Sequence, residues 1–409
     1  MSRRKKNNQG LKIIVALSSI ILVFAAVIIV VLLRKEPDNK VSQTYSGDQP
    51  WQSGENKQAS EIPKTKAPDD VETQSAKMPE SGTPGQFERF HTAGSFNGIM
   101  ILNGEAGIEI RNGNNEIIQL ITVDGQVNNM VSDGSSLYFS TNGDGRHGLF
   151  NGNIQNGMCE TLLSEPDKYI TVEGANDKYI FFTSYTEEMW YDPILCTYSM
   201  ETGEVREIAN GAGDITVSGS TVIYMGARTD VSATPMKIIT EEGQAVAQKP
   251  DVMYYVLAGD TIIYLENTNP SEYYKSVGKS CDLKGAQEKV ILDSVNTFMW
   301  NALDDSRVCY VEMLDGMSYG NELSILDVIS GEVLKLPWGN YGCFGQAGTY
   351  PYILGGGTLY VFMDNKLEIL ASGIRNEVTT IAEAGGKIYG VYRENYNGPV
   401  KLEYLADTP

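Results

Sequence analysis

The stretch DGSSLYFSTNGDGRHGLF, from Asp133 to Phe150, shows the pattern that decides the fold. Two short apolar segments flank a glycine-rich turn, and a second turn around Gly134 precedes the first of them. Apolar segments separated by such turns are typical of antiparallel β-hairpins. The stretch therefore predicts two β-strands joined by a loop that presents Arg146 and His147.

The same pattern recurs from about residue 90 to the end of the sequence. Aligning the central residue of each aromatic strand, from Tyr138 to Tyr389, gives steps of 43, 43, 40, 46, 50 and 29 residues. Recurrence at nearly one period is the signature of a repeat fold. The aligned strands are SLYFS (136–140), YIFFT (179–183), VIYM (222–225), IIYL (262–265), VCYV (308–311), LYVF (359–362) and IYGV (388–391).

Each well-defined repeat also contains a second hairpin with a glycine turn. The four examples are YSMETGEVREI, ITEEGQAVAQ, DLKGAQEKVIL and LDVISGEVLKL. Four strands in about 43 residues is the size of one propeller blade. A β-sandwich or a string of small β-domains would also have short strands and frequent turns, but the single period favours the propeller.

The predicted fold class is all-β, a β-propeller of seven four-stranded blades, with eight blades as the alternative. Two features leave the blade count open between seven and eight: a weaker version of the repeat centred near Ile101, and the short last step of 29 residues. We expect the N-terminal strands to complete the ring begun by the C-terminal KLEYLAD, residues 401–407.

The N-terminal region predicts a membrane anchor. Residues 13–33 are a run of 21 residues without a charge, long enough to cross a bilayer as a helix. Basic residues among 1–12 outnumber those just after the run, which places the N-terminus in the cytoplasm. A cleaved signal peptide is the alternative, but no A-x-A cleavage pattern follows Leu33.

The remaining chain divides into a stalk and the propeller. Residues 34–88 are rich in Ser, Thr, Gln, Lys, Glu and Pro and predict a disordered extracytoplasmic stalk, and residues 89–409 form the propeller domain. The whole chain has a formal charge of −20, and its first 35 residues carry seven basic and no acidic side chains. The exterior part is therefore strongly acidic, which disfavours nucleic acid as a partner.

Few residues suit metal binding or redox chemistry. Five cysteines show no C-x-x-C spacing, and we expect most of them to be core residues, with a Cys159–Cys196 disulfide as the alternative. Two histidines are too few for a histidine-rich metal site. The sequence also has no EF-hand spacing and no glycine-rich phosphate loop. We predict neither a metal nor a cofactor.

The repeats resemble the membrane-anchored bacterial extracytoplasmic β-propellers of unknown function, whose blades are similar in style to the TolB and YWTD types. The resemblance covers roughly residues 90–409 and rests on blade motifs with an aromatic strand and a glycine turn. The chain has no YWTD tetrapeptide, no WD dipeptide at blade ends and no sialidase box. The resemblance implies a binding or scaffolding domain and transfers no catalytic residue.

Candidate catalytic motifs fit turns better than active sites. The sequence GMSYG, with Ser318 at its centre, matches G-x-S-x-G, but it lies between two predicted strands and both histidines precede it. The adjacent acids Asp304 and Asp305 are expected to form a turn. Their adjacency is no evidence for a catalytic pair, because neighbouring side chains of a strand point to opposite faces. We assign no catalytic residue.

The loops between the second and third strands of all blades emerge on one face of a propeller. Their aromatic and charged residues suit stacking on sugars or contact with a peptide. The predicted function is non-catalytic recognition of a cell-wall glycan, peptide or envelope protein on a Gram-positive surface, and the alternative is a propeller-type glycosidase or lyase. The candidate ligand-binding residues are Arg146, His147, Trp190, Tyr191, Arg228, Tyr273, Tyr274, Tyr319, Arg393 and Tyr396.

Overall fold

The computed structural model describes residues 87–409 except for 97, 144–146, 190, 227–233, 269–275, 296, 315–317, 338–340, 348–349, 364–365 and 395–398. The chain divides into two units, Met1–Gln74 and Ser75–Pro409, and the described residues belong to the second. The predicted membrane helix and nearly all of the predicted stalk lie outside the described residues. In the described part of the chain, no helix has the length and apolar character needed to cross a membrane.

The described residues form antiparallel sheets whose strands follow one another along the chain. The first sheet consists of β2 (Ala93–Phe96), β3 (Ile99–Asn103), β4 (Gly107–Arg111) and β5 (Ile117–Thr122). The second consists of β1 (Glu88–Phe90), β6 (Gln126–Ser132), β7 (Ser136–Asn142), β8 (Gly148–Asn153) and β9 (Cys159–Ser164). The third consists of β10 (Tyr169–Ala175), β11 (Tyr179–Tyr185), β12 (Ile194–Ser199) and β13 (Val205–Asn210). A short 3₁₀ helix, η1 (Glu187–Met189), lies between β11 and β12.

The next sheet has seven strands and contains two repeats. Its strands are β14 (Gly213–Ser218), β15 (Thr221–Met225), β16 (Thr234–Thr240), β17 (Ala245–Ala258), β18 (Thr261–Asn267), β19 (Ser276–Asp282) and β20 (Lys289–Val295). The first half of β17 pairs with β16 and its second half pairs with β18. Asp251, with a φ of 56°, marks the point where β17 passes from the outer edge of one repeat to the inner edge of the next.

Three further sheets complete the described structure. They are β21 (Thr297–Ala302), β22 (Arg307–Leu314), β23 (Ser318–Asp327) and β24 (Val333–Pro337); β25 (Tyr341–Ala347), β26 (Tyr350–Gly355), β27 (Thr358–Met363) and β28 (Lys366–Ser372); and β29 (Val378–Ala384), β30 (Lys387–Arg393) and β31 (Val400–Asp407).

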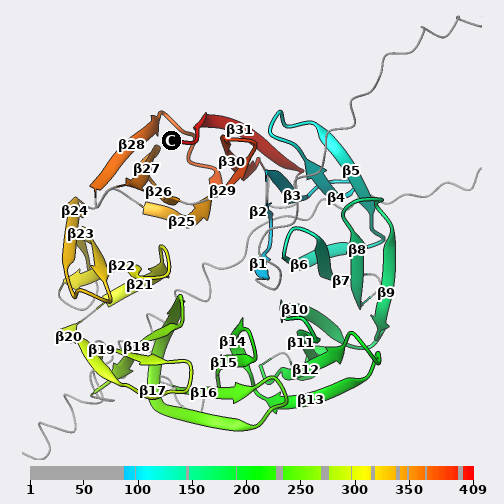
Figure 1. Ribbon diagram of the computed structural model, residues 1–409, viewed down its shortest axis with the longest axis horizontal. Helices are drawn as coiled ribbons and strands as arrows, with labels where there is room; N and C mark the ends of the chain where they lie inside the picture. The colour runs from blue at the N-terminus through cyan, green and yellow to red at the C-terminus, as the bar shows by residue number, and fades with distance from the viewer. Residues whose placement is uncertain are drawn as a thin grey trace, which may run out of the picture. The chain divides into compact units, whose positions relative to one another are not determined.

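The sheets stand side by side in a ring, with the first strand of each repeat on the inside (Figure 1). Each of the eight hydrophobic clusters of the described residues lies between two successive repeats, and one of them joins β29–β31 to β2 and β3. Radial antiparallel sheets around a centre are the architecture of a β-propeller. The predicted all-β propeller is therefore confirmed, whereas the blade count stays a prediction.

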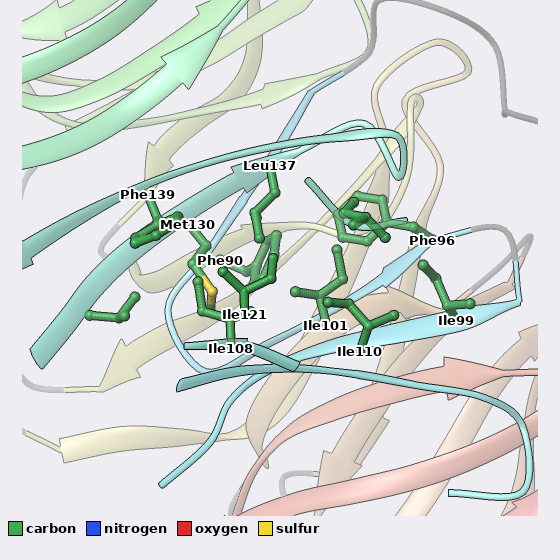
Figure 2. Packing of buried hydrophobic residues seen from close by; sticks show 12 residues of the cluster. Phe90, Phe96, Ile99, Ile101, Ile108, Ile110, Ile121, Met130, Leu137 and Phe139 are labelled. Atoms are coloured by element: carbon green, nitrogen blue, oxygen red, sulfur yellow. The ribbon is translucent and has the colours of Figure 1, made fainter. Parts of the chain in front are cut away.

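Alternation along each strand explains how one sheet contacts both neighbours. Phe181 packs toward the following repeat and Phe182 toward the preceding one, because adjacent side chains of a strand point to opposite faces. Figure 2 shows the cluster between the first two sheets, where Ile108 and Ile121 of one sheet lie beside Met130 of the other. All three side chains are fully buried.

The turns between strands are held by short polar side chains. Oδ1 of Asp133 accepts bonds from the backbone N–H groups of Ser135 and Ser136, at 2.8 and 2.7 Å. Asn176 makes the same contacts with the next turn, and Asp304 does so with Ser306. Such Asx turns fix a tight bend by giving its backbone N–H groups a side-chain acceptor. The prediction that Asp304 lies in a turn is confirmed.

One predicted strand occupies a different place in its sheet. The segment LYVF lies in β27, the third strand of its repeat, whereas the aromatic pattern predicts a second strand. The second strand is β26, whose Tyr352 comes 42 residues after Tyr310 and 37 before Tyr389. The alignment of Tyr360 was therefore wrong, and this error produced the irregular steps of 50 and 29.

The ring closes where the sequence predicted, but by packing and not by a shared sheet. β31, which contains KLEYLAD, pairs only with β30 among the described strands, while β2 begins a sheet of its own. The contact includes a bond from the Glu383 backbone N–H to Ser95 Oγ at 2.7 Å and one from Tyr389 Oη to the Gly113 carbonyl at 2.8 Å.

Candidate functional site

The second-to-third strand loops and the fourth-to-first connections emerge on the same side of the ring, which we call the loop face. Six predicted site residues lie outside the described residues, and for Tyr319 only the backbone is described. The six are Arg146, Trp190, Arg228, Tyr273, Tyr274 and Tyr396. Tyr319 was expected in a loop, but its backbone belongs to β23, one residue past the strand's start.

His147 and Tyr191 differ strongly in exposure. His147 is only 9% exposed, its Nδ1 lies 2.8 Å from the Lys168 carbonyl oxygen, and its ring lies 4.5 Å from that of Tyr169. These contacts tie the β7–β8 loop to the beginning of β10. Tyr191 follows η1 and is 68% exposed. The structure thus gives His147 a bracing position, whereas Tyr191 presents an aromatic surface to solvent.

Arg393 is a predicted site residue that lines two hollows of the loop face. It ends β30, and its Nη2 donates to the Asn103 carbonyl oxygen at 3.4 Å, across the junction where the ring closes. Two adjoining cavities, of about 340 and 660 Å³, share Arg393, Asn103, Gln126 and Val127 in their walls. The predicted loop-face position of Arg393 therefore coincides with a concave surface.

The walls of these two cavities carry mainly amides and hydroxyls. The side-chain amide of Asn103 donates to the Val127 carbonyl oxygen at 3.0 Å, and that of Asn129 donates to the Val172 carbonyl oxygen at 3.1 Å. These bonds fix the orientation of both amides and leave acceptor and donor atoms beside the cavity. The other polar residues of the walls are His91, Thr92, Glu105, Gln126, Asn128, Thr171, Thr379 and Glu394.

The amide residues of the cavity were not predicted from the sequence. Gln126, Asn128 and Asn129 belong to the beginning of β6, an inner strand, and not to a second-to-third strand loop. The beginning of every inner strand reaches the loop face, so the segment QVNN between two apolar strands was the available signal. The second-to-third strand loops are only one of the two sets of segments that meet on this face.

An ion pair lies on the inner side of the ring. Arg89 of β1 pairs with Glu173 of β10, and the Thr183 hydroxyl donates to Glu173 Oε1 at 2.9 Å. The Glu173 side chain is 11% exposed. Desolvation by burial raises the pKa of Glu173 above its usual value, although the charge of Arg89 opposes this shift. The carboxyl is thus poised to hold a proton more readily than an exposed glutamate.

The predicted turn acids and the G-x-S-x-G motif lie in plain structural settings. Asp304 pairs with Arg307, and although desolvation by burial raises its pKa, the bonds from Arg307 and the turn N–H groups outweigh that effect and lower it. The motif lies between two strands as predicted, but Ser318 belongs to β23 and not to the loop, and it pairs with Leu314 across the β22–β23 hairpin. The described elements on either side of residues 315–317 are both strands, whereas a nucleophile elbow joins a strand to a helix.

The described cysteines carry free thiols. Cys159 is exposed, whereas Cys196, Cys281 and Cys309 are buried, as predicted for core residues. Cys159 and Cys196, the alternative disulfide pair, are both free. Among the described residues, no three His, Cys, Asp or Glu side chains are grouped as a metal site would require, and the expected absence of metal and cofactor stays a prediction.

Comparison with solved structures finds similar folds. The chain is similar to the computationally designed Ika8 protein, with a TM-score of 0.52 at 12% identity over 80% of this chain and 98% of that one. It is also similar to an oligogalacturonate lyase from Vibrio parahaemolyticus, with a TM-score of 0.49 at 11% identity, covering 80% of this chain and 98% of that one.

A third similar structure is the β-propeller domain of the Trilobed protease from Pyrococcus furiosus, described as having an open velcro topology. Its TM-score is 0.46 at 13% identity, covering 68% of this chain and 89% of that one. No family model and no curated protein matches the chain. At such low identity the likeness concerns the fold alone, and the function must be argued from the site.

Proposed function

We propose that the protein is a non-catalytic binding propeller that holds a polyhydroxylated ligand, a cell-wall glycan, in the joined cavities beside Arg393. The observation that carries this proposal is the pair of adjoining cavities that share the amides Asn103 and Gln126 beside Arg393, with threonine hydroxyls lining the larger one. Amides can donate to one sugar hydroxyl and accept from the next, and Arg393 adds several donors in a fixed plane. A peptide or an envelope protein is the other outcome of the test.

The acidic exterior also bears on the ligand. With a formal charge of −20 for the whole chain, the domain repels polyanions, so a neutral or weakly charged glycan is favoured. Exposed aromatics of the loop face, such as Tyr191, would add stacking contacts at the rim. The aromatic residues Trp190, Tyr273, Tyr274 and Tyr396, together with Arg146 and Arg228, belong to this proposal as further rim contacts.

We further propose that the propeller has eight blades and is displayed outside a Gram-positive cell. The eight hydrophobic clusters between successive repeats support the count. The uncharged run at 13–33, with its preceding basic residues, supports an N-in membrane anchor followed by a flexible stalk. Protease added to intact cells should then remove the propeller while leaving the N-terminal peptide protected.

The binding proposal can be tested with the full chain and isolated cell-wall polysaccharide. The variant Gln126→Ala with Asn128→Ala removes two amides from the cavity walls, and each lost hydrogen bond is worth about 0.5–1.5 kcal/mol. Binding should weaken by roughly ten- to a hundredfold. Gln244→Ala, in an exposed turn on the opposite face, is the matched control. Equal binding by both variants would refute the assigned cavity.

The second candidate function, a propeller-type glycosidase or lyase, is favoured by one observation. Glu173 has a raised pKa, with desolvation as the main cause and the Asp214 charge as a minor one, and a proton-holding carboxyl suits a general acid. Cleavage of the polysaccharide by the wild-type chain, abolished in Glu173→Gln, would replace the binding proposal with this one. Cleavage should not be observed if the binding proposal is correct.

A further inference from the structure

Among the described residues, the sheet β29–β31 has no fourth strand, whereas every other described repeat has one. In the other repeats an outer strand, such as β5 or β28, pairs with the third strand. β31 is a third strand, and its outer edge pairs with no described strand. Half of the backbone N–H and C=O groups of an edge strand point outward without partners, which makes the edge a template for another strand.

The burial of β31 is consistent with a missing outer strand. The third strands β16 and β19 alternate between buried and half-buried residues, whereas most residues of β31 are half-buried and Tyr404 is 53% exposed. The strand is eight residues long. It therefore offers both an unpaired backbone edge and incompletely covered apolar side chains.

The sequence of β31 is complementary to itself in one antiparallel register. When two copies pair about a two-fold axis through Leu402, Val400 of each copy lies opposite Tyr404 of the other. Lys401 then lies opposite Glu403, twice. Opposite charges and aromatic–β-branched pairs at directly opposed positions both stabilise antiparallel pairing. Within the paired stretch, Val400, Leu402 and Tyr404 fall on one face of the new sheet, and Lys401 and Glu403 fall on the other.

We propose that β31 pairs with β31 of a second copy of this chain, in the register centred on Leu402, to form a symmetric dimer. The pairing joins two three-stranded sheets into one continuous six-stranded sheet. Two-fold symmetry is the commonest arrangement of homo-oligomers, and it allows one self-complementary strand to supply both halves of the contact. The dimer interface lies on the outer rim and leaves the loop face open.

Existing ion pairs do not block this contact. Lys401 Nζ lies 2.7 Å from Glu394 Oε1, and Arg375 Nε lies 2.7 Å from Glu403 Oε2. The four side chains are between 32% and 57% exposed, so each can turn toward a partner across the edge at small cost. A lysine in an edge strand usually opposes pairing, but here the two-fold register places it against a carboxylate.

Charge reversal with the full-length chain tests the register. Lys401→Glu puts two glutamates opposite each other and Glu403→Lys puts two lysines together, so each variant alone should be monomeric, with dimerisation weakened roughly tenfold or more. An equimolar mixture of the two variants should form a heterodimer, because unlike charges then meet at both positions. The double variant should dimerise like the wild type. Sedimentation velocity measures each state.

The controls separate the interface from folding. Lys366→Glu and Glu368→Lys reverse the same spacing in β28, which is already an outer strand, and should leave the dimer unchanged. Thermal melting shows whether each variant is folded. A monomeric wild type, dimerisation of either single variant, or a double variant that stays monomeric would each overturn the proposal.

Discussion

Tyr255 provides a direct test of how the inner strands are held together. Its hydroxyl lies 3.1 Å from Thr216 Oγ1 and 3.0 Å from the Ile223 carbonyl oxygen, and it also bonds the Asp214 carbonyl. The side chain is 8% exposed. Tyr255 belongs to the second half of β17, whereas its three partners belong to β14 and β15, so this one hydroxyl joins neighbouring repeats.

We expect Tyr255→Phe to lower the free energy of unfolding by about 2 kcal/mol. The phenylalanine ring fills the same space, so no cavity forms, but a donated and an accepted hydrogen bond are lost and a buried carbonyl loses its partner, at about 1 kcal/mol for each bond. The hydroxyl also supports Asp214, whose φ of 46° is unusual for a residue other than glycine.

Urea denaturation followed by intrinsic fluorescence measures the change. The adjacent Tyr254 is 43% exposed, and Tyr254→Phe should change the free energy of unfolding by less than about 0.5 kcal/mol. The midpoint of Tyr255→Phe should fall with an unchanged slope. If the two variants have the same stability, the hydroxyl does not join the repeats and the reasoning is refuted.

Three further predictions concern the network, the core and a turn. The hydrogen bond from Lys249 lowers the pKa of Glu288 from 4.5 to about 2, so its stabilisation is present above pH 4.5 and lost as the pH falls toward 2. Melting curves across that range should show Glu288→Gln losing less stability than the wild type, by under about 1 kcal/mol because the side chain is 39% exposed. Phe139→Ala should cost roughly 3–5 kcal/mol in urea denaturation, since the ring is fully buried; a cost below about 1 kcal/mol would contradict its core position. Gly285→Ala should cost roughly 1–3 kcal/mol, because φ is +70° and the new Cβ would lie 2.5 Å from that of Ala247; unchanged melting would contradict this turn.

The repeats could be predicted from the sequence because each one places its aromatic strand in the core. Tyr138, Phe181 and Tyr264 lie in second strands and are buried, as the spacing indicated. LYVF was assigned to the wrong strand because its preceding GGGT resembles a first turn. Glycine turns look alike wherever they fall in a repeat, so only the pairing of β26 with β27 could resolve the register.

The candidate site was predicted only in part for a different physical reason. Arg393 could be recognised because it ends an aromatic strand before a loop. Asn103, Gln126 and Asn129 come from segments that meet only when the ring closes and the first two repeats pack together. Their proximity depends on how the sheets are arranged around the ring, and no local pattern in the sequence reports that arrangement.

The central claim is that the cavities beside Arg393 hold a glycan. Hydrogen–deuterium exchange of the full chain, with and without soluble cell-wall fragments, tests it most directly. The account predicts slower exchange on ligand addition at 103–107 and 126–129, which form the cavity walls, and no change in the opposite-face turn at 304–307. Protection confined to the opposite face, or none at all under saturating ligand, would contradict the claim.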